Sequence, residues 1–520
     1  MSRYFVTTPI YYVNDAPHIG HAYTTLACDV LARFMRLDGR VVRFLTGTDE
    51  HGQKVEKAAA EKGVDPQAFT EEISQNFRHL ADTMNFSYDD FIRTTEARHI
   101  ASCQAIWKAI ADRQSPKCQE NIYLDKYAGW YAVRDEAFYT EAELQEGPGG
   151  QKLAPTGAEV EWVEEPSYFF RLSDWQDSLL KYYQDNPDFI APTSRRNEVV
   201  SFVEGGLNDL SISRTTFSWG VPVPDDEEHI MYVWLDALTN YITAVGHPND
   251  KDALWEYWPA DLHMVGKDIL RFHTVYWPAF LMAAGIEPPK RVFAHGWWTN
   301  EGQKISKSLG NVIDPFELVD RYGLDPIRYF LLRQVPFGND GDFSHQAMVH
   351  RLNGDLANDL GNLCQRVLSM IFRNCDGNIP PSHELTEGDI AFVDGIAASI
   401  EELRKLMDAQ SFHQALELIW RHVGNANRYV DEHAPWELRK NDPVRMETVL
   451  YTLSEAIRNL AILTSPFMPD AMTRIFDQMG VAATDRTFTH LGRAHGLAEG
   501  TPLAGKPQPI FPRFVEEEGA

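Results

Sequence analysis

Two histidines lie three residues apart near the start of the chain, in the segment Pro17-His-Ile-Gly-His21. The segment follows a short apolar run and precedes a stretch of helical periodicity, so we place it at the beginning of a helix. Unpaired backbone N–H groups at a helix N-terminus favour anions, and side chains three apart project from one face. Imidazole donors at His18 and His21 would suit charge that develops on a phosphoryl oxygen. Gly20 leaves room for a flat ring against the backbone.

Two lysines, Lys304 and Lys307, lie three residues apart in the segment Glu301-Gly-Gln-Lys-Ile-Ser-Lys-Ser-Leu-Gly-Asn311. The serines and glycines around them predict a mobile loop, and the compact ammonium group of lysine suits phosphate oxygens. Taken alone, each of these two segments is more often a polar helix start or a solvated basic loop. The sequence contains no GxxxxGK[ST] loop, no GxGxxG after a strand and no HExxH helix. A nucleotide, if one is bound, therefore depends on the histidine and lysine segments.

The elements around the histidines predict a parallel sheet. An apolar run at residues 5–8 favours a buried strand, and Pro17 is typical of the first residue of a helix that ends at Gly39. Residues 41–45 predict the next strand and residues 53–62 the next helix. Strands that alternate with helices indicate parallel pairing.

This pattern breaks between residues 116 and 225, where Gly-Pro turns, acidic clusters and short aromatic runs predict an inserted subdomain. Strands are expected again at residues 230–235, 262–265 and 291–295. From Asp342 onward an apolar stripe of helical spacing begins at Met348 and ends at Val367, and later segments repeat it. We therefore predict an α/β Rossmann-like parallel-sheet domain, split by an insertion and followed by an all-α helical bundle. The expected boundaries are 1–115 and 226–289 for the two halves of the sheet domain, 116–225 for the insertion, 290–345 for the lysine-loop and connecting region, and 346–520 for the bundle.

Composition excludes several classes of protein. The chain has 520 residues, of which 44% are hydrophobic and 24% charged, as in ordinary globular proteins and unlike disordered ones. No apolar run approaches the roughly 18 residues that a membrane span needs, and the first nine residues have no signal-peptide core. The five cysteines are widely spaced and form no Cys-x-x-Cys pair, which argues against disulfides and against cysteine-ligated zinc. We expect a cytoplasmic protein.

The net charge of −27 (48 Lys and Arg against 75 Asp and Glu) disfavours a nucleic-acid partner when it is averaged over the molecule. Residues 290–333, however, carry seven Lys and Arg against five Asp and Glu, so this stretch is locally basic. Composition leaves RNA binding open without predicting it.

The one-letter motifs HIGH (residues 18–21) and KISKS (residues 304–308) are together similar to the two signatures of class I aminoacyl-tRNA synthetases. Three further stretches, at residues 7–14, 232–241 and 263–273, resemble the methionyl-tRNA synthetase family, and the resemblance covers essentially the whole chain. It implies an enzyme that activates L-methionine with ATP to methionyl-adenylate and pyrophosphate, then transfers methionine to the 3′-terminal ribose of tRNA(Met). It also implies a methionine site of Ile10, Tyr12, Asp49, Trp234, Ala237, Leu238, Tyr241, Ile269 and His273.

The resemblance assigns roles to the two motifs. His18 and His21 would stabilise the α-phosphate region, and Lys304 and Lys307 would close over the outer phosphates. The expected ATP-binding residues are Gly20, Lys267, Asp268, Ser306 and Ser308. Mg²⁺ is expected to accompany ATP, although the sequence offers no dedicated protein cage for it.

A second recognition event falls on the helical bundle, where the family reads the anticodon. Asn362 and Arg366 are four residues apart and thus share a helix face. Trp436 follows Pro435 in a stretch similar to the family's anticodon-reading turn, and could stack on a splayed base. The resemblance implies both elongator and initiator tRNA(Met) as partners.

The chain departs from the family pattern in two places. Ile305 replaces the consensus Met of the lysine motif, and its similar bulk predicts no loss of function. Many relatives carry zinc-binding Cys-x-x-Cys knuckles in the insertion, but residues 127–138 contain no cysteine, so we expect no structural zinc and no metal site. No further module follows the bundle in this sequence, which predicts a monomer.

Three alternatives stay open. A class I synthetase for leucine, isoleucine or valine would carry a larger editing insertion, and one for cysteine would need thiolate ligands. A HIGH-type nucleotidyltransferase for a small metabolite would not need the helical bundle with Trp436. A non-enzymatic RNA-binding paralogue would have lost the activating residues, whereas His18, His21, Lys304 and Lys307 are all present.

Overall fold

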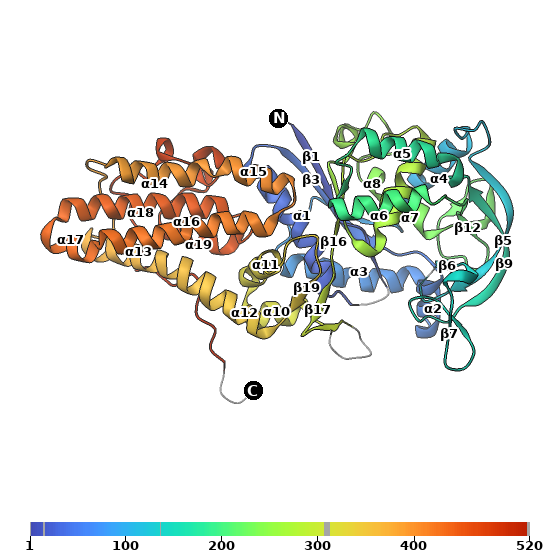
Figure 1. The fold of residues 1–520 in the computed structure, drawn as a ribbon, viewed down its shortest axis with the longest axis horizontal. Helices are drawn as coiled ribbons and strands as arrows, with labels where there is room; N and C mark the ends of the chain where they lie inside the picture. Colours follow the sequence, from blue (N-terminus) through green and yellow to red (C-terminus); the bar gives the residue numbers. More distant parts are fainter. Residues whose placement is uncertain (1, 14–15, 136, 306–311, 517–520) are drawn as a thin grey trace. The chain divides into compact units, whose positions relative to one another are not determined.

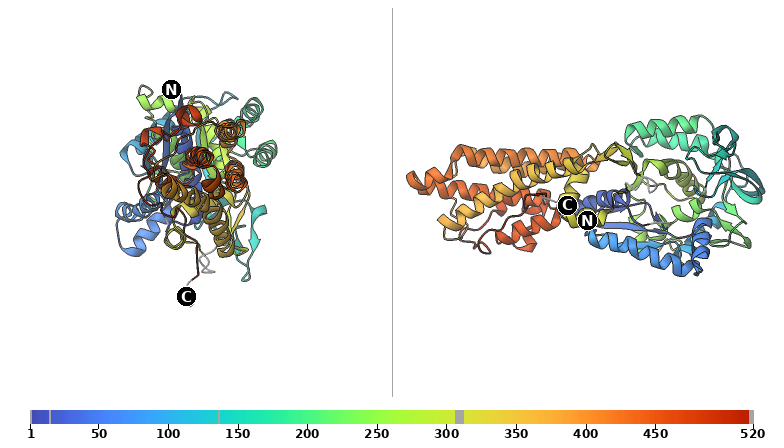
Figure 2. Two further views of the ribbon diagram at one scale, coloured as in Figure 1. Left: turned by 90° about the vertical axis from the view of Figure 1, so that its left-hand side faces the viewer. Right: turned by 90° about the horizontal axis from the view of Figure 1, so that it is seen from below.

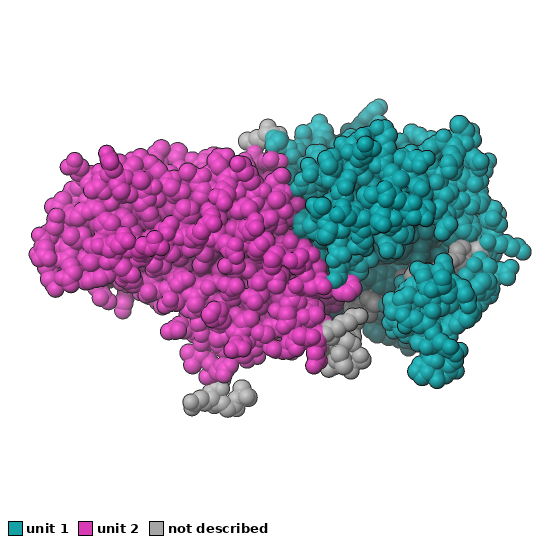
Figure 3. Space-filling model, in the orientation of Figure 1, with its two compact units in different colours: residues 1–17, 41–295 teal, residues 18–40, 296–520 magenta. Residues whose placement is uncertain are grey.

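The computed structural model describes residues 2–13, 16–135, 137–305 and 312–516. The chain divides into two compact units that are interleaved in sequence (Figure 3). Unit 1 comprises residues 1–17 and 41–295, and unit 2 comprises residues 18–40 and 296–520. The first helix after the first strand thus belongs to the same compact unit as the C-terminal half of the chain.

Unit 1 contains the predicted parallel sheet. Its strands run in the order β10-β16-β15-β1-β3-β2, with β4 also paired to β3, and all of these pairs are parallel. The central strands are apolar and buried, as parallel strands covered on both faces must be. Their bounds are β1 Arg3–Thr7, β2 Tyr11–Tyr12, β3 Val41–Asp49, β4 Asp90–Arg93, β10 Ile190–Ala191, β15 Leu262–Gly266 and β16 Val292–His295.

Two details of the prediction are wrong. The first helix, α1, spans Ile19–Leu37 and therefore begins after Pro17, because the side chain of His18 caps it. Residues 230–235 do not form a strand of the parallel sheet: β14 (Asp226–Met231) pairs antiparallel with β12 and β13, and α7 begins at Val233. A short apolar run fits a buried helix as well as a buried strand, so periodicity could not distinguish them.

The range that we predict to be an insertion contains antiparallel structure. Strands β5 (Ile122–Ala132) and β9 (Glu161–Phe170) form a long ribbon, which β6 (Ala137–Tyr139) and β11 (Leu210–Ser211) extend (Figure 1). Trp130 and Trp162 pack edge to face with ring centroids 5.3 Å apart, and the ammonium group of Lys152 lies over Trp130. The remaining short strands are β7 Gln145–Glu146, β8 Lys152–Leu153, β12 Ser213–Arg214 and β13 Pro222–Val223. The domain boundaries themselves stay a prediction.

The helices of unit 1 bury one large hydrophobic cluster against the sheet, which includes Phe5, Leu45, Tyr241 and Trp277. Their bounds are α2 Gln53–Lys62, α3 Pro66–Thr83, α4 Ala97–Ala111, α5 Gln176–Asp185, α6 Thr193–Glu204, α7 Val233–Leu238, α8 Asn240–Thr243 and α9 Trp277–Ala284. Two short helical segments, η4 (Lys267–Ile269) and η5 (Phe272–Tyr276), connect β15 to α9.

Unit 2 is mainly helical, with a small sheet of β17 (Trp298–Asn300), β18 (Gln303–Lys304) and β19 (Gly341–Phe343). The long helices α16 and α18 lie side by side (Figures 1 and 2). A π-helical segment, η7 (Leu352–Gly361), precedes α13. The other bounds are α10 Pro315–Tyr322, α11 Leu324–Arg333, α12 His345–Arg351, α13 Asn362–Asn374, α14 Glu387–Ala398, α15 Ile400–Asp408, α16 Phe412–His433, α17 Pro435–Asn441, α18 Pro443–Thr464 and α19 Pro469–Gln478.

Helix α1 is fixed within unit 2 by buried polar and aromatic contacts. A guanidinium nitrogen of Arg328 lies 2.6 Å from a carboxylate oxygen of Asp29, and both side chains are fully buried. The ring of Tyr23 meets Trp298 edge to face with centroids 5.5 Å apart. The helix that begins with the HIGH motif is therefore packed against the small sheet and the helices that follow it.

None of the described helices is long and apolar enough to cross a membrane.

Candidate functional site

The head of α1 is built by the two histidines of the HIGH motif. The ring nitrogen Nδ1 of His18 accepts a hydrogen bond from the Gly20 N–H at 3.1 Å, and Nδ1 of His21 accepts one from the His18 N–H at 3.1 Å. These reciprocal bonds cap the helix, and the two rings stack with centroids 3.8 Å apart. Because both Nδ1 atoms accept, the protons of the neutral rings are on Nε2. The head of the helix thus carries two imidazole N–H donors beside its positive end.

Gly20 is required for this geometry. A Cβ at position 20 would lie 2.9 Å from Cε1 of His18, so a side chain there would displace the capping ring. The ring that lies against the Gly20 backbone is therefore that of His18. Burial, and secondarily the neighbouring His18, hold the pKa of His21 well below its usual value. His21 is consequently a neutral hydrogen-bond donor at pH 7.

The lysine segment begins in unit 2, which also contains α1. Lys304 ends strand β18, which pairs with β17, and Ile305 is the last residue described before residue 312. Ser306, Lys307 and Ser308 lie outside the described residues. Where the description resumes, the carbonyl of Ile313 accepts a hydrogen bond from the Ile19 N–H at 3.3 Å. The chain that leaves the lysine segment is therefore bonded directly to the head of the HIGH helix.

The methionine-site candidates all lie in unit 1. Tyr12 and Asp49 are register partners on the adjacent parallel strands β2 and β3, so their Cα atoms are neighbours. Asp49 is 7% exposed. This pair places a buried aspartate and a tyrosine on neighbouring strands at the carboxyl end of the sheet, where ligands of α/β proteins commonly bind.

Tyr241 and His273 form the polar contact of this region. The Tyr241 hydroxyl lies 2.7 Å from Nε2 of His273, and Nδ1 of His273 lies 2.9 Å from the Ile269 carbonyl oxygen. Since a carbonyl only accepts, Nδ1 carries the proton, and Nε2 accepts from the tyrosine. Burial lowers the pKa of His273 to about 4. The ring is therefore neutral at pH 7 and held in one tautomer by its two partners.

The aliphatic and aromatic candidates gather around this pair. Leu238 and Tyr241 belong to the large buried cluster, and Ile10, Trp234 and Ile269 pack against it. Ala237 is buried on α7, next to Leu238. The structure thus brings together the seven candidates other than Tyr12 and Asp49. Tyr12 and Asp49 are neighbours of each other on β2 and β3, and the Tyr12 ring joins a separate cluster with Tyr11 and Val55. Aromatic walls with a polar tip suit a long, polarizable thioether.

The sequence did not identify Phe272 as part of this region. Its ring stacks on Trp234, the half-buried aromatic of α7, with centroids 3.5 Å apart and planes 8° apart. The sequence did contain an indication of this residue, because Phe272 precedes His273 in the family-like stretch at residues 263–273. The two nucleotide candidates Lys267 and Asp268 form the start of η4, where Lys267 is half-buried and Asp268 exposed.

Two of the three anticodon candidates meet in unit 2. The guanidinium carbon of Arg366 lies 5.5 Å from the ring centroid of Trp436, and a guanidinium nitrogen bonds Asp431 at 2.9 Å. Trp436 is 41% exposed. Asn362 is exposed one turn before Arg366 on α13. An exposed indole beside a guanidinium is a suitable platform for an unpaired base.

Among the described residues, one group of His, Cys and Asp side chains offers three ligand atoms within 4.8 Å of one another: His99, Cys103 and Asp236. All three are buried in unit 1, and the sequence analysis identified none of them. Asp236 lies inside the family-like stretch at residues 232–241, whereas His99 and Cys103 lie on α4, far away in sequence. A buried carboxylate in an apolar stretch was the only available signal.

Comparison with known proteins shows which family this chain resembles. Residues 4–368 match the family "tRNA synthetases class I (M)", and residues 379–520 match the "Anticodon binding domain of methionyl tRNA ligase". The chain is 55% identical over 518 residues to a Methionine--tRNA ligase of Mesorhizobium japonicum, with 100% of this chain and 99% of that protein covered. It is also 55% identical over 516 residues to a Methionine--tRNA ligase of Brucella suis, with 99% of each covered.

A solved structure supports the same relationship. The chain superposes with a TM-score of 0.94 and 51% identity on Mycobacterium tuberculosis methionyl-tRNA synthetase in complex with methionyl-adenylate, covering 99% of this chain and 100% of that one. The apo form of the same synthetase gives a TM-score of 0.88 at 48% identity, with 99% of each chain covered. The Rossmann-like sheet, the helical bundle and the resemblance of the two motifs are thereby confirmed, and the chain belongs to the methionyl group of the class I aminoacyl-tRNA synthetases.

Proposed function

We propose that this protein is a methionine–tRNA ligase. It activates L-methionine with ATP and then transfers methionine to the 3′-terminal ribose of tRNA(Met). The observation that carries the proposal is the full-length likeness to methionine–tRNA ligases, in a chain that keeps both the HIGH histidines and the KISKS lysines. The relatives named above are methionine–tRNA ligases, which favours methionine over leucine, isoleucine, valine, cysteine or a small metabolite as the substrate.

In the first half-reaction a methionine carboxylate oxygen attacks the α-phosphorus of ATP, the bond to the bridging oxygen breaks, and pyrophosphate leaves. Little covalent chemistry is available to the protein, so positioning and charge stabilisation supply the catalysis. The Nε2–H groups of His18 and His21 donate to the α-phosphate region, and the capped geometry at Gly20 supports this assignment. Lys304 and Lys307 neutralise the outer phosphates.

The remaining ATP contacts come from Lys267, Asp268, Ser306 and Ser308. These side chains offer one ammonium group, two hydroxyls and a single carboxylate, which do not form the oxygen cage of a resident metal site. We therefore infer that Mg²⁺ arrives on the phosphates of ATP. No structural zinc has a role in the proposal.

For the amino acid, Asp49 binds the ammonium group, and the thioether lies among the clustered apolar residues. Tyr241 and His273 provide the polar end of this site, and the neutral state of His273 suits an uncharged sulfur. The complete set is Ile10, Tyr12, Asp49, Trp234, Ala237, Leu238, Tyr241, Ile269 and His273.

In the second half-reaction a ribose hydroxyl of the tRNA attacks the methionyl carbonyl and AMP leaves. Asn362, Arg366 and Trp436 read the anticodon, and the exposure of the Trp436 ring beside Arg366 supports this role. We propose that elongator and initiator tRNA(Met) are both substrates, that the protein acts as a monomer in the cytoplasm, and that the boundaries predicted from the sequence delimit its domains.

ATP–pyrophosphate exchange over a panel of amino acids tests the proposal. We expect exchange with methionine and none above background with leucine, isoleucine, valine or cysteine. Exchange with one of these instead of methionine would refute the substrate, and no exchange with any of them would favour an RNA-binding paralogue. Charging of tRNA(Met) transcripts then tests the second half-reaction.

A further inference from the structure

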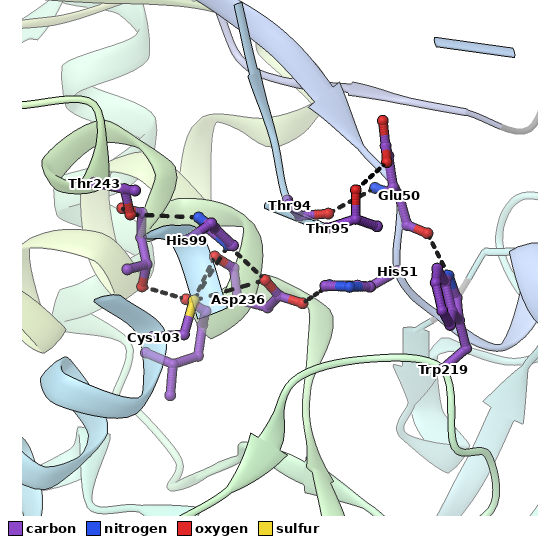
Figure 4. A network of polar contacts seen from close by, with 11 residues as sticks. Glu50, His51, Thr94, Thr95, His99, Cys103, Trp219, Asp236 and Thr243 are labelled. Atoms are coloured by element: carbon purple, nitrogen blue, oxygen red, sulfur yellow. Dashed lines mark hydrogen bonds and ion pairs between the residues drawn. The ribbon is translucent and has the colours of Figure 1, made fainter. Parts of the chain in front are cut away.

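Asp236 is a fully buried carboxylate to which the proposed reaction assigns no role. One of its oxygens, Oδ2, lies 2.7 Å from Nδ1 of His51, and the other, Oδ1, lies 2.8 Å from Nε2 of His99 (Figure 4). Asp236 and His99 are completely buried, and His51 is 4% exposed. The carboxylate thus joins two rings that are 185 and 137 residues away from it in sequence.

The direction of both hydrogen bonds follows from the charge of the carboxylate. Burial by itself raises the pKa of Asp236, but the attraction and hydrogen bonds of His51 and His99 prevail and hold it well below its usual value. An ionised carboxylate accepts and cannot donate, so Nδ1 of His51 and Nε2 of His99 both carry protons. The bond to Asp236 therefore fixes which nitrogen of His51 is protonated and which way the ring faces.

His51 belongs to the segment that carries Asp49, the residue proposed to bind the substrate ammonium. Neighbouring bonds hold this segment on its other side: the Trp219 indole donates to the Glu50 carbonyl at 2.6 Å, and the Trp219 carbonyl accepts from the Gly52 N–H at 3.0 Å. Figure 4 shows Trp219 and Asp236 approaching residues 50–51 from different sides. With Asp236 removed, the attachment to Trp219 remains, but the bond to α7 is lost.

Helix α7 carries three of the proposed contacts to the methionine side chain. Trp234, Ala237 and Leu238 lie on the same short helix as Asp236. The bond between Asp236 and His51 is therefore a direct connection between the helix that would contact the thioether and the strand end that would contact the ammonium group. His99, on α4, holds the second carboxylate oxygen and so fixes the orientation of Asp236.

We propose that Asp236 is a positioning residue that sets the distance between the ammonium-binding and thioether-binding sides of the methionine site, through His51. The proposal rests on the proposed function, because it assumes that methionine is the substrate. It assigns no contact between Asp236 and the substrate itself.

A metal ion is the main competing explanation, since His99, Cys103 and Asp236 could each supply a ligand atom. The separations favour hydrogen bonds. Donor atoms about 2.0–2.3 Å from a tetrahedral zinc lie more than 3 Å apart, whereas Nε2 of His99 and Oδ1 of Asp236 are 2.8 Å apart.

Asp236→Asn tests the proposal because it keeps the shape of the side chain and replaces one accepting oxygen with a donating NH₂ group. At least one imidazole must then lose its bond or change its tautomer. In ATP–pyrophosphate exchange we expect the KM for methionine to rise about 10-fold to 100-fold, because small misplacements of binding groups have effects of this size. The KM for ATP should change by less than about twofold. If this variant does not fold, His51→Gln carries the same test, because it leaves Asp236 bonded to His99.

Cys103→Ala is the matched control. Its Sγ lies 3.2 Å from Nε2 of His99 and 3.8 Å from Oδ1 of Asp236 in the same buried cluster, but it is no part of the bond between Asp236 and His51 that connects α7 to the Asp49 segment. We expect a lower unfolding temperature and an unchanged KM for methionine. The double variant of Asp236→Asn and His51→Gln should be no worse than the more severe single variant, since both remove one link.

Four outcomes are distinguishable. A wild-type protein that does not activate methionine would refute the proposed function itself. An active wild type with a methionine KM that Asp236→Asn leaves unchanged, or that rises equally in Cys103→Ala, would overturn the positioning role. Stoichiometric zinc in the purified wild-type protein, lost in Asp236→Asn, would replace it with a metal site. The selective rise in methionine KM, with no bound metal, supports it.

Discussion

Tyr241→Phe removes one oxygen atom from the proposed methionine site and so tests how that site is oriented. The hydroxyl donates to Nε2 of His273 at 2.7 Å, and the two side chains are 1% and 2% exposed. A buried acceptor left without its donor costs about 1–3 kcal/mol. Because His273 would keep only its bond to the Ile269 carbonyl, its ring could turn away from the position that the substrate requires.

The free energy of the lost hydrogen bond also sets the expected size of the effect on activity. At about 1.4 kcal/mol for each factor of ten, the loss corresponds to a decrease of about 5-fold to 140-fold in kcat/KM for methionine. We expect most of it in KM, because a thioether is bound similarly in the ground state and the transition state. The assay is ATP–pyrophosphate exchange with methionine varied at saturating ATP, together with urea unfolding to measure stability.

Tyr183→Phe provides the matched comparison. The Tyr183 hydroxyl also donates a buried hydrogen bond, to the Thr274 carbonyl at 2.6 Å, and its ring belongs to the same hydrophobic cluster. It is not among the proposed substrate contacts, so its loss should lower the free energy of unfolding by a similar amount without raising the methionine KM. Our reasoning is refuted if the two variants change KM equally, or if Tyr241→Phe loses stability alone.

Three further predictions concern other parts of the chain. Trp436→Ala should leave pyrophosphate exchange intact while raising the KM for tRNA. The increase should correspond to the roughly 1–3 kcal/mol that stacking on one base contributes. Equal losses in exchange and charging would mean that Trp436 has a structural role. Arg328→Met should lower the free energy of unfolding, measured in urea, by up to about 3 kcal/mol, because it removes one of two guanidinium partners of the buried carboxylate of Asp29 and leaves the other, Arg33, in place. Burial places the pKa of His273 at about 4, below that of an unfolded histidine, so its contribution to stability is complete above about pH 6.5 and lost as the pH falls toward 4. The stability difference between pH 7 and pH 4.5 should accordingly be smaller in His273→Gln than in the wild type, and an equal difference would contradict the assignment.

The parallel sheet could be predicted from the sequence because its strands have a strong local signature. Strands β1, β3, β15 and β16 are short apolar runs followed by helices or loops, which is the pattern that buried parallel strands produce. Residues 230–235 show the limit of this reasoning. Their apolar run ends one strand and begins α7, and no periodicity marks the change.

The start of α1 could not be predicted because its cap is unusual. Ser, Thr, Asp and Asn are the common capping residues, whereas here the imidazole of His18 accepts the bond and the ring fills the space that Gly20 leaves open. Pro17 therefore gave a misleading signal for the first helical residue. His18 and Gly20 both belong to the HIGH motif, so the unusual helix cap involves a proposed catalytic residue, His18.

The network around Asp236 could not be predicted, since it depends on contacts between residues far apart in sequence. Each of its three members is individually unremarkable in the sequence, and only folding brings α4, α7 and the end of β3 together. The ring contact between Trp436 and Arg366 is equally non-local: family resemblance suggested each residue as an anticodon contact, but not that the two side chains meet.

The central claim is that His18, His21, Lys304 and Lys307 accelerate formation of methionyl-adenylate by stabilising charge on the phosphates. The most direct measurement is the single-turnover rate of adenylate formation at saturating methionine and ATP, for the wild type, His21→Ala and Lys307→Ala. We predict that each substitution lowers this rate about 100-fold or more, as the removal of one stabilising donor does elsewhere, and leaves the affinity for tRNA(Met) unchanged. Rates equal to that of the wild type, or parallel losses of tRNA affinity and adenylate formation, would contradict this account.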